Sequence, residues 1–411
     1  MNVTLKKVTY EGVLSAPPSK SAAHRRLICA GLAEGQSRLF PVADSEDMLA
    51  TLDCLAALGV SFSKEGEAVV LDGCSPLQRK EAVFPCRESG STLRFFLPLA
   101  LLSDKPAVFR GSKTLMKRPL DVYEHICIEQ GLDFMLDEEE LRVCGPLKSG
   151  HFRIDGSVSS QFVSGLLFAL PLLEGYSILE LTPPVVSAPY IAMTVEAMNA
   201  FGVKIESLDE NRLLIPGGQH YTPAALTVEG DWSNAAFFLA LNLLGSDIEV
   251  TGLNKNSLQG DRVVRRMLGK LERGCPTLDI ADCPDLAPIL MAVGAALNGV
   301  RLTNTDRLKD KESNRSEAMA EELGKLGVTV VFGENELTVL PPKELLPPKT
   351  ALQGHNDHRI VMACAVLLTL VGGTVEGAEA VSKSFPDFFE KLNSLTAIPR
   401  EDEKEPRYDT R

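Results

Sequence analysis

The chain repeats one pattern of polar and apolar residues six times. A short cluster rich in Ser, Asp, Lys or Arg is followed at once by an almost unbroken apolar stretch. Because Ser and Asp are favoured helix N-caps and most of the stretches end at Gly, each copy predicts a buried helix with a polar head at its N-terminus. The heads begin at Ser19, Ser89, Ser159, Asp231, Pro284 and Asn356, about 70 residues apart except for one interval nearer 50.

A second, amphipathic segment follows each apolar one and in most copies closes on Gly and a strand-like run. These segments lie at residues 47–62, 122–134, 193–205, 261–274, 316–331 and 388–395. Short β-rich runs lie at 68–72, 107–110, 141–144, 177–181, 213–215, 247–251 and 337–340. The pattern predicts a mixed α/β unit of about two helices and three or four strands, repeated six times.

Helices that are apolar on every side must be enclosed by other elements. Three such helices in each half of the chain predict two lobes, each with buried helices surrounded by sheets and amphipathic helices. We place the first lobe at residues 18–229 and the second at residues 1–17 and 230–411, so that the chain crosses twice between them.

Composition and charge narrow the classes of function. The 411 residues are 45% hydrophobic and 24% charged, which is typical of a globular protein of two or three domains. A net charge of -13 disfavours binding to nucleic acid or anionic membranes. Any anionic ligand therefore needs a locally basic site. The apolar runs at 286–297 and 360–370 are too short to span a bilayer and predict buried core helices.

The cysteines and the first residues indicate the compartment. Nine cysteines without CxxC pairs or a His-rich cluster favour reduced, mostly buried thiols over disulfides or metal ligands. The start MNVTLKKVTYEG lacks the features of a signal or transit peptide. We therefore expect a cytoplasmic protein that begins near Met1. The charged segment after Pro399 is expected to be frayed.

The polar heads carry the candidate chemistry. Helix N-termini expose unpaired N–H groups and favour anions, so six heads can share one anion-binding cleft. The alternative for any single head is simple helix capping. Lys20 and Arg25 oppose the dipole at the start of the first helix, a cost that an anionic ligand would offset. Gly90 permits a small anion to approach the backbone of the second helix.

Carboxylates lie among cations at two further places. Asp285 begins one helix head, and Lys311, Glu312 and Arg315 lie within one turn of each other. Such carboxylates can do general acid–base work, although a solvated charged loop is the alternative. Motifs for nucleotides, metals and serine nucleophiles do not occur, so we expect no metal and no covalent serine. Other candidates at helix heads are His358, Arg359 and Lys383.

Eight short blocks occur in a fixed order between Pro18 and Phe389: PSKSAAHR, SGSTLR, MKRP, SSQF, VVSAPY, DKESNR, NDHR and SKSFPDFF. Together they resemble the signature blocks of the 5-enolpyruvylshikimate-3-phosphate (EPSP) synthase family. The resemblance implies a two-lobed enolpyruvyl transferase fold of six βαβαββ units with buried helices, an inside-out α/β barrel. It also implies transfer of the enolpyruvyl group of phosphoenolpyruvate to the 5-hydroxyl of shikimate 3-phosphate, with release of phosphate and without a cofactor.

The resemblance implies roles for individual residues as well. Shikimate 3-phosphate would be bound by Lys20, Ser21, Arg25, Ser159, Ser160, Gln161, Ser187, Tyr190, Asp285 and Lys311. Phosphoenolpyruvate would be held by Lys20, Gly90, Gln161, Arg315, Arg359 and Lys383, in a pocket that glyphosate would also occupy. The catalytic residues would be Lys20, Glu312 as the acid and Asp285 as the base, although two coupled carboxylates can exchange these roles.

Two positions depart from the family pattern. Glu88 stands where the family usually has Asn, which puts a carboxylate near the donor pocket. Thr114 stands where some members have Arg; Lys113 and Lys117 are the candidates to substitute, and we leave this contact unassigned.

Two alternative functions stay open. A UDP-N-acetylglucosamine enolpyruvyl transferase would use a loop cysteine as its acid, and no cysteine lies in a comparable Gly-rich loop here. A catalytically silent homologue would bind the same anions without turnover. In either case we expect small-molecule ligands, no nucleic acid or membrane partner, and a monomer.

Overall fold

Each predicted polar head begins a helix in the computed structural model, which describes residues 1–400. The predicted helix starts agree with the observed ones to within three residues. The buried helices are α1 (Lys20–Leu32), α3 (Gly90–Ala100), α6 (Ser160–Ala169), α8 (Trp232–Leu243), α10 (Ala287–Ala296) and α12 (His358–Val371). The side chains that cap five of them are Ser19, Ser89, Ser159, Asp231 and Asp357. The exception is α10, which begins from a 3₁₀ turn at Pro284–Leu286. The charged tail expected to be frayed lies outside the described residues from position 401 on.

The amphipathic segments also form helices, with shifted boundaries in two copies. They are α2 (Glu46–Leu58), α5 (Asp121–Gln130), α7 (Ala188–Ala200), α9 (Val264–Leu271), α11 (Arg315–Gly324) and α13 (Phe388–Ser394). A one-turn helix, α4 (Lys113–Met116), precedes α5. Helix α7 begins five residues earlier than predicted, with Pro189 in its first turn, and α9 follows a 3₁₀ turn at Gly260–Val263. Gly59 ends α2 in a left-handed conformation (φ +106°).

The described strands form six sheets, and all seven predicted β-runs lie within them. One sheet has the strand order β14 (Ala225–Thr227), β3 (Gly35–Phe40), β5 (Ala68–Gly73), β4 (Ser61–Glu65). A second has the order β6 (Ala82–Arg87), β7 (Ala107–Gly111), β9 (Glu140–Cys144), β8 (Asp133–Leu136). A third has the order β10 (His151–Asp155), β11 (Tyr176–Thr182), β13 (Arg212–Pro216), β12 (Glu206–Ser207). The fourth sheet has the order β16 (Thr277–Asp279), β17 (Val300–Thr303), β19 (Glu336–Leu340), β18 (Thr329–Gly333). The fifth has three strands in the order β15 (Asp247–Thr251), β2 (Val8–Ser15), β22 (Thr396–Pro399). The sixth also has three, in the order β1 (Asn2–Leu5), β21 (Gly373–Glu376), β20 (Leu352–Gln353).

The four-stranded sheets share one topology, which reflects the sequence repeat. In every four-stranded sheet the first two strands are parallel and the remaining pairs are antiparallel. The sheet of β3 is completed by β14, which comes much later in the chain. Strand β2 lies between β15 and β22, and β1 pairs with β21, so that both ends of the described chain belong to the same half of the molecule.

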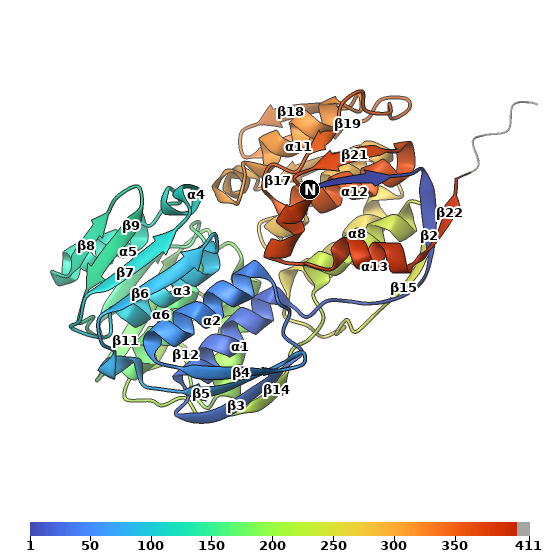
Figure 1. Cartoon of the computed structure of the whole chain (residues 1–411). Helices are drawn as coiled ribbons and strands as arrows, with labels where there is room; N and C mark the ends of the chain where they lie inside the picture. The colour runs from blue at the N-terminus through green and yellow to red at the C-terminus, as the bar shows by residue number, and fades with distance from the viewer. Residues whose placement is uncertain (401–411) are drawn as a thin grey trace, which may run out of the picture.

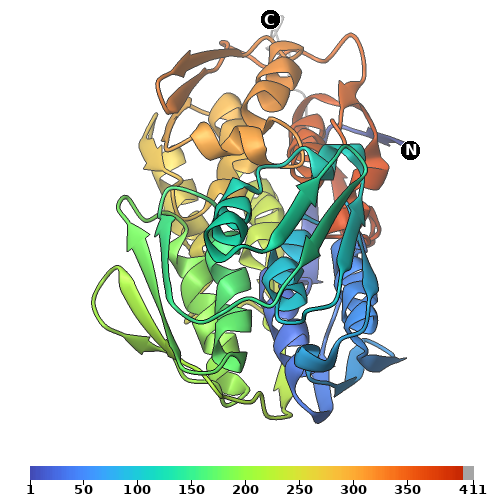
Figure 2. The ribbon, with the colours of Figure 1, turned by 90° about the vertical axis from the view of Figure 1, so that its left-hand side faces the viewer.

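The buried apolar side chains fall into two clusters. One runs from Ala22 to Val228, and the other combines Leu5–Leu14 with residues from Trp232 to Leu395. We call the parts built around them the first and the second lobe; Figure 1 shows them side by side. Within the first lobe, α1, α3 and α6 lie among the sheets, and Figure 2 shows its helices running roughly alongside one another.

The predicted core helices are confirmed. Residues 287–295 and 358–369 are all buried. Among residues 1–400 no helix has the length and apolar character needed to cross a bilayer. All nine cysteines are free thiols, and six of them are buried.

The close contact between α3 and α6 can be tested at Gly165. A Cβ at this position would collide with the Tyr123 hydroxyl and the Arg94 carbonyl oxygen, which are hydrogen-bonded to each other at 2.7 Å. We expect Gly165→Ala to lower the free energy of unfolding by about 1–3 kcal/mol, measured by urea denaturation.

Gly269 in α9 provides the matched control, because a Cβ there would meet no atom within 4 Å. Gly269→Ala should leave stability unchanged or raise it by about 0.5–1 kcal/mol. Equal losses in the two variants would contradict the packing argument.

Candidate active site

The polar heads of both lobes meet around one cavity of about 70 Å³. This volume has room for only a few water molecules. Twelve of the predicted site residues line it: Lys20, Ser21, Arg25, Ser159, Ser160, Gln161, Ser187, Tyr190, Asp285, Lys311, Glu312 and Arg315. The remaining predicted residues, Gly90, Arg359 and Lys383, do not line it.

The cavity is locally basic in an acidic protein. Six cationic side chains line it, three from each lobe: Lys20, Arg25 and Arg118, and Arg307, Lys311 and Arg315. The same wall carries the carboxylates of Asp285 and Glu312. This arrangement agrees with the expectation that an anionic ligand would need a site whose charge opposes the average of the surface.

Arg315 is the centre of the charge network in the second lobe. Its side chain is only 2% exposed and donates to Asp285 at 2.7 Å, to Glu312 at 2.7 Å and to Asp357 at 2.8 Å. Burial alone would lower its pKa, but the three carboxylates outweigh burial and hold the pKa well above the usual value. One guanidinium therefore fixes both candidate catalytic carboxylates and the N-cap of α12.

Both candidate catalytic carboxylates are ionised in this arrangement. Burial would raise the pKa of Asp285, but Lys311, Arg315 and Arg359 hold it well below its usual value. Burial would likewise raise the pKa of Glu312, which Arg315 and Arg118 hold well below normal. Glu312 is therefore not protonated at neutral pH while its two arginine partners remain in place.

Lys20 extends from the first turn of α1 toward the carboxylates. Its ammonium group pairs with Asp47 at 2.8 Å, and its backbone N–H donates to Asp231 at 3.0 Å. Burial lowers the pKa of Lys20, but Asp47 and Glu312 more than compensate, so that the pKa is raised.

Arg25 and Gln161 are held in place by hydrogen bonds within the first lobe. Arg25 donates from Nε to Thr194 at 2.8 Å and from Nη1 to the Ser21 carbonyl at 2.8 Å. Burial lowers the pKa of Arg25 to about 10, which still leaves it charged. The Gln161 amide is oriented from both ends, by Arg94 at 2.8 Å and by Ser91 at 2.9 Å.

The sequence analysis missed several lining residues, of which Arg118 is the most informative. Lys113 and Lys117, the suggested substitutes for an arginine at position 114, are exposed and do not line the cavity. Arg118 of the MKRP block does line it and lies 3.6 Å from Glu312. The MKRP block points to this region in the sequence. It does not show which of Lys117 and Arg118 faces the cavity, because that depends on how the chain leaves α4. His358, a helix-head candidate without an assigned role, also lines the cavity, and the other lining residues that were not predicted are Ser91, Phe95, Pro284 and Arg307.

Two of the three predicted residues outside the cavity, Gly90 and Arg359, approach residues that line it. A Cβ on Gly90 would lie 2.5 Å from Nη1 of Arg118, so this glycine makes room for the guanidinium. Arg359 is buried and lies 3.7 Å from Asp285, while its Nε and Nη1 have no protein partner. Lys383 is paired with Glu88 of the first lobe at 2.5 Å.

The lobes also meet at Ser187 and Tyr190. The Ser187 backbone N–H donates to the Ala281 carbonyl at 3.2 Å, and Arg307 donates to the Ser187 hydroxyl at 2.7 Å. The Tyr190 hydroxyl donates to Asp261 at 2.8 Å. Burial and the nearby charge of Asp285 raise the pKa of Asp261 from 3.8 to about 7.

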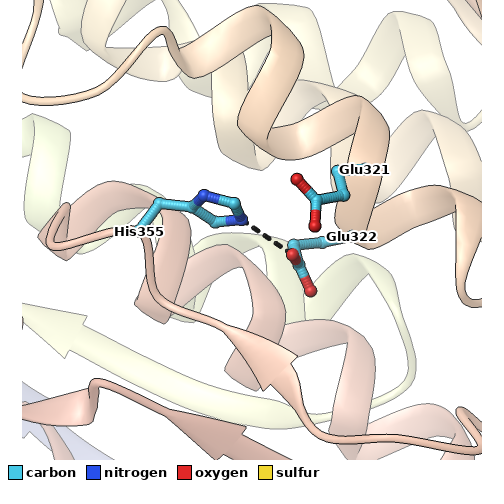
Figure 3. A group of neighbouring side chains, drawn as sticks. All are labelled: Glu321, Glu322 and His355. Carbon is cyan, nitrogen blue, oxygen red and sulfur yellow. Dashed lines mark hydrogen bonds and ion pairs between the residues drawn. The ribbon is translucent and has the colours of Figure 1, made fainter.

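A buried carboxylate supports the loop that enters α12 (Figure 3). Glu322 accepts hydrogen bonds from Lys325 at 2.8 Å and from the Gln353 backbone N–H at 2.8 Å, and it lies 2.7 Å from His355 Nε2. Together with Glu321 these are residue types that bind metals, but both oxygens of Glu322 already have partners. The group therefore anchors the loop, in which His355 and Asn356 adopt left-handed φ angles of 48° and 52°.

Solved structures of other proteins share this fold. EPSP synthase from Acinetobacter baumannii superposes with a TM-score of 0.76 at 23% identity, covering 96% of this chain and 98% of that one. The enolpyruvyl transferase NikO from Streptomyces tendae superposes with a TM-score of 0.75 at 14% identity, covering 96% and 97%. The predicted two-lobed enolpyruvyl transferase fold is therefore confirmed.

Sequence relatives define the family more narrowly. The model of the family EPSP synthase (3-phosphoshikimate 1-carboxyvinyltransferase) matches residues 6–277 and 274–392. The 3-phosphoshikimate 1-carboxyvinyltransferase of Clostridium kluyveri is 38% identical over 419 residues, with 96% of this chain and 97% of the relative covered. That of Clostridium perfringens strain 13 is 37% identical over 414 residues, with coverage of 95% and 97%.

The chain belongs to the EPSP synthase family. It is a transferase of the shikimate pathway that moves the enolpyruvyl group of phosphoenolpyruvate to shikimate 3-phosphate and releases phosphate. This confirms the function predicted from the signature blocks. The UDP-N-acetylglucosamine alternative has no comparable support.

The raised pKa of Asp261 predicts a pH-dependent loss of stability. An unfolded Asp titrates near 3.9, so the folded protein holds an extra proton between about pH 4 and pH 7 and loses stability as the pH rises through this range. Asn cannot ionise. We expect the stability of Asp261→Asn relative to the wild type to be greater at pH 7.5 than at pH 5, measured as urea midpoints. A difference that is the same at both pH values would contradict the raised pKa.

Proposed function

We propose that the cavity between the lobes is the site of enolpyruvyl transfer. The observation that carries this proposal is the convergence of cations from both lobes on two carboxylates fixed by Arg315. Shikimate 3-phosphate would bind Lys20, Ser21, Arg25, Ser159, Ser160, Gln161, Ser187, Tyr190, Asp285 and Lys311. Phosphoenolpyruvate would bind Lys20, Gln161, Arg315, Arg359 and Lys383 above Gly90, and we add Arg118 to this set.

In this proposal Glu312 supplies the proton to the methylene carbon of phosphoenolpyruvate. Arg118 and Arg315 keep Glu312 ionised in the empty site. A bound donor brings negative charge to the same two guanidinium groups, which weakens their effect on Glu312 and raises its pKa. Donor binding would thus favour the protonated form of Glu312, which is the form that can donate a proton. Glu312 is the better candidate for the acid than Asp285. Asp285 keeps Lys311 as a further cationic neighbour at 3.2 Å, and this ammonium group favours its ionised form.

Asp285 then accepts the proton of the shikimate 5-hydroxyl as that oxygen bonds to the cationic carbon of the donor. Phosphate then leaves with the proton held by Asp285, and the ionised Glu312 takes back one methyl proton, which restores the enol ether in the product. Lys20, close to Glu312 and paired with Asp47, would balance the charge that develops on the leaving phosphate.

We further propose that residues 18–229 and residues 1–17 with 230–411 act as two domains that open and close. Residues of both lobes line the cavity, so that parting of the lobes would admit the substrates and closing would complete the site around them. We also propose that the enzyme is cytoplasmic and monomeric; nine free cysteines support a reducing compartment.

The central test is release of phosphate from phosphoenolpyruvate and shikimate 3-phosphate by the wild type and by Glu312→Gln. Gln keeps the size and hydrogen bonding of the side chain but cannot donate a proton to carbon. We expect kcat to fall by about 10²–10⁴, with binding of shikimate 3-phosphate retained in calorimetry. A variant with near wild-type kcat would remove Glu312 from the mechanism. A wild type that binds both substrates without releasing phosphate would instead mark a silent homologue.

Gly90 gives a second test, of the donor pocket. The methyl group of Gly90→Ala would lie against Nη1 of Arg118 and displace this guanidinium, which is one of the proposed donor ligands. A ligand longer than phosphoenolpyruvate has less room to adjust. We therefore expect the glyphosate inhibition constant to rise by a larger factor than KM for phosphoenolpyruvate. If both constants rise equally, Gly90 shapes the helix start and does not discriminate between the ligands.

A further inference from the structure

Glu88 lies in the first lobe at the entrance to α3, where it meets two residues of the second lobe. Its carboxylate pairs with Lys383 at 2.5 Å and accepts from the Asn356 side-chain amide at 3.2 Å. Lys383 also donates to the Asn356 carbonyl oxygen at 2.6 Å. The Glu88 carboxylate and the Asn356 carbonyl thus hold the Lys383 ammonium group. In this arrangement Lys383 does not line the cavity.

The exposure of the two partners differs, which indicates what the pair can do. The Lys383 side chain is 10% exposed, whereas that of Glu88 is 39% exposed. An ion pair with one half-exposed partner adds little to the closure of the lobes. Its larger effect is on the charge available to a ligand, because a lysine that already has a carboxylate partner attracts a second anion less strongly.

We propose that Glu88 is a specificity-determining residue of the donor site, whose carboxylate competes with the anionic donor for Lys383. This inference rests on the proposed function, which places Lys383 among the phosphoenolpyruvate ligands. To bind the donor, the Lys383 ammonium group must either share its charge between Glu88 and the donor or leave Glu88, and in both cases the carboxylate repels the incoming anion. Both effects weaken binding of the donor and of any anionic inhibitor in the same pocket.

The test is steady-state kinetics of Glu88→Gln. Gln keeps the shape of the side chain and can still accept from Asn356, but it removes the negative charge. We expect KM for phosphoenolpyruvate to fall by about three- to tenfold, with kcat within about twofold of the wild type. KM for shikimate 3-phosphate should not change, because this substrate does not use Lys383.

Glu46→Gln is the matched control. Glu46 lies in the same lobe and pairs at 2.6 Å with Arg87, which does not line the cavity. The substitution removes the same charge and an ion pair of similar length. KM for phosphoenolpyruvate should stay at the wild-type value. An equal fall in both variants would reduce the effect to overall charge and overturn the proposal.

Lys383→Met, alone and combined with Glu88→Gln, separates this inference from the proposed function. If Lys383 binds the donor, Lys383→Met raises KM for phosphoenolpyruvate, and in that background Glu88→Gln has lost most of its effect. If Lys383→Met raises KM but Glu88→Gln does not lower it in the wild-type background, the inference fails and the assignment of Lys383 stands. If Lys383→Met leaves KM unchanged, both fail.

Discussion

The site depends on the burial of one guanidinium group among three carboxylates. Arg315 is 2% exposed and reaches Asp285, Glu312 and Asp357 from a single side chain. A buried charge is tolerated only when it is paired and hydrogen-bonded, so the partners are fixed in position as strictly as the arginine is. Two of them face the cavity and the third caps α12. Arg315 therefore couples the positions of the two candidate catalytic carboxylates to the N-terminus of α12.

The repeated unit explains how such a site arises in an acidic protein. Each unit contributes a buried helix, and a helix surrounded by apolar neighbours presents polar groups only at its ends. Helix heads from both lobes gather at one place, and the cations and caps gather with them. The surface elsewhere stays acidic. The contrast between a basic cavity and a net charge of -13 therefore follows from the architecture.

The fold was largely predictable, because N-caps and apolar runs are local signals. Ser19, Ser89 and Ser159 cap helices where the pattern placed them. The signature blocks supplied most of the site residues. Two kinds of feature escaped prediction. The position of the Arg118 side chain depends on how the chain leaves the one-turn helix α4, which the sequence does not specify. The partnership of Glu88 with Lys383 joins residues almost 300 positions apart, and no local pattern specifies it.

The position of β2 between β15 and β22 determines the order in which the lobes can assemble. A chain made from its N-terminus completes the strands of the first lobe by residue 227, whereas β2 has no partner until residues 247–251 exist and no second one until residues 396–399 do. The residues made earliest must therefore wait unpaired for those made last. The second lobe is consequently the more non-local of the two, and its assembly is the step most open to mispairing during synthesis.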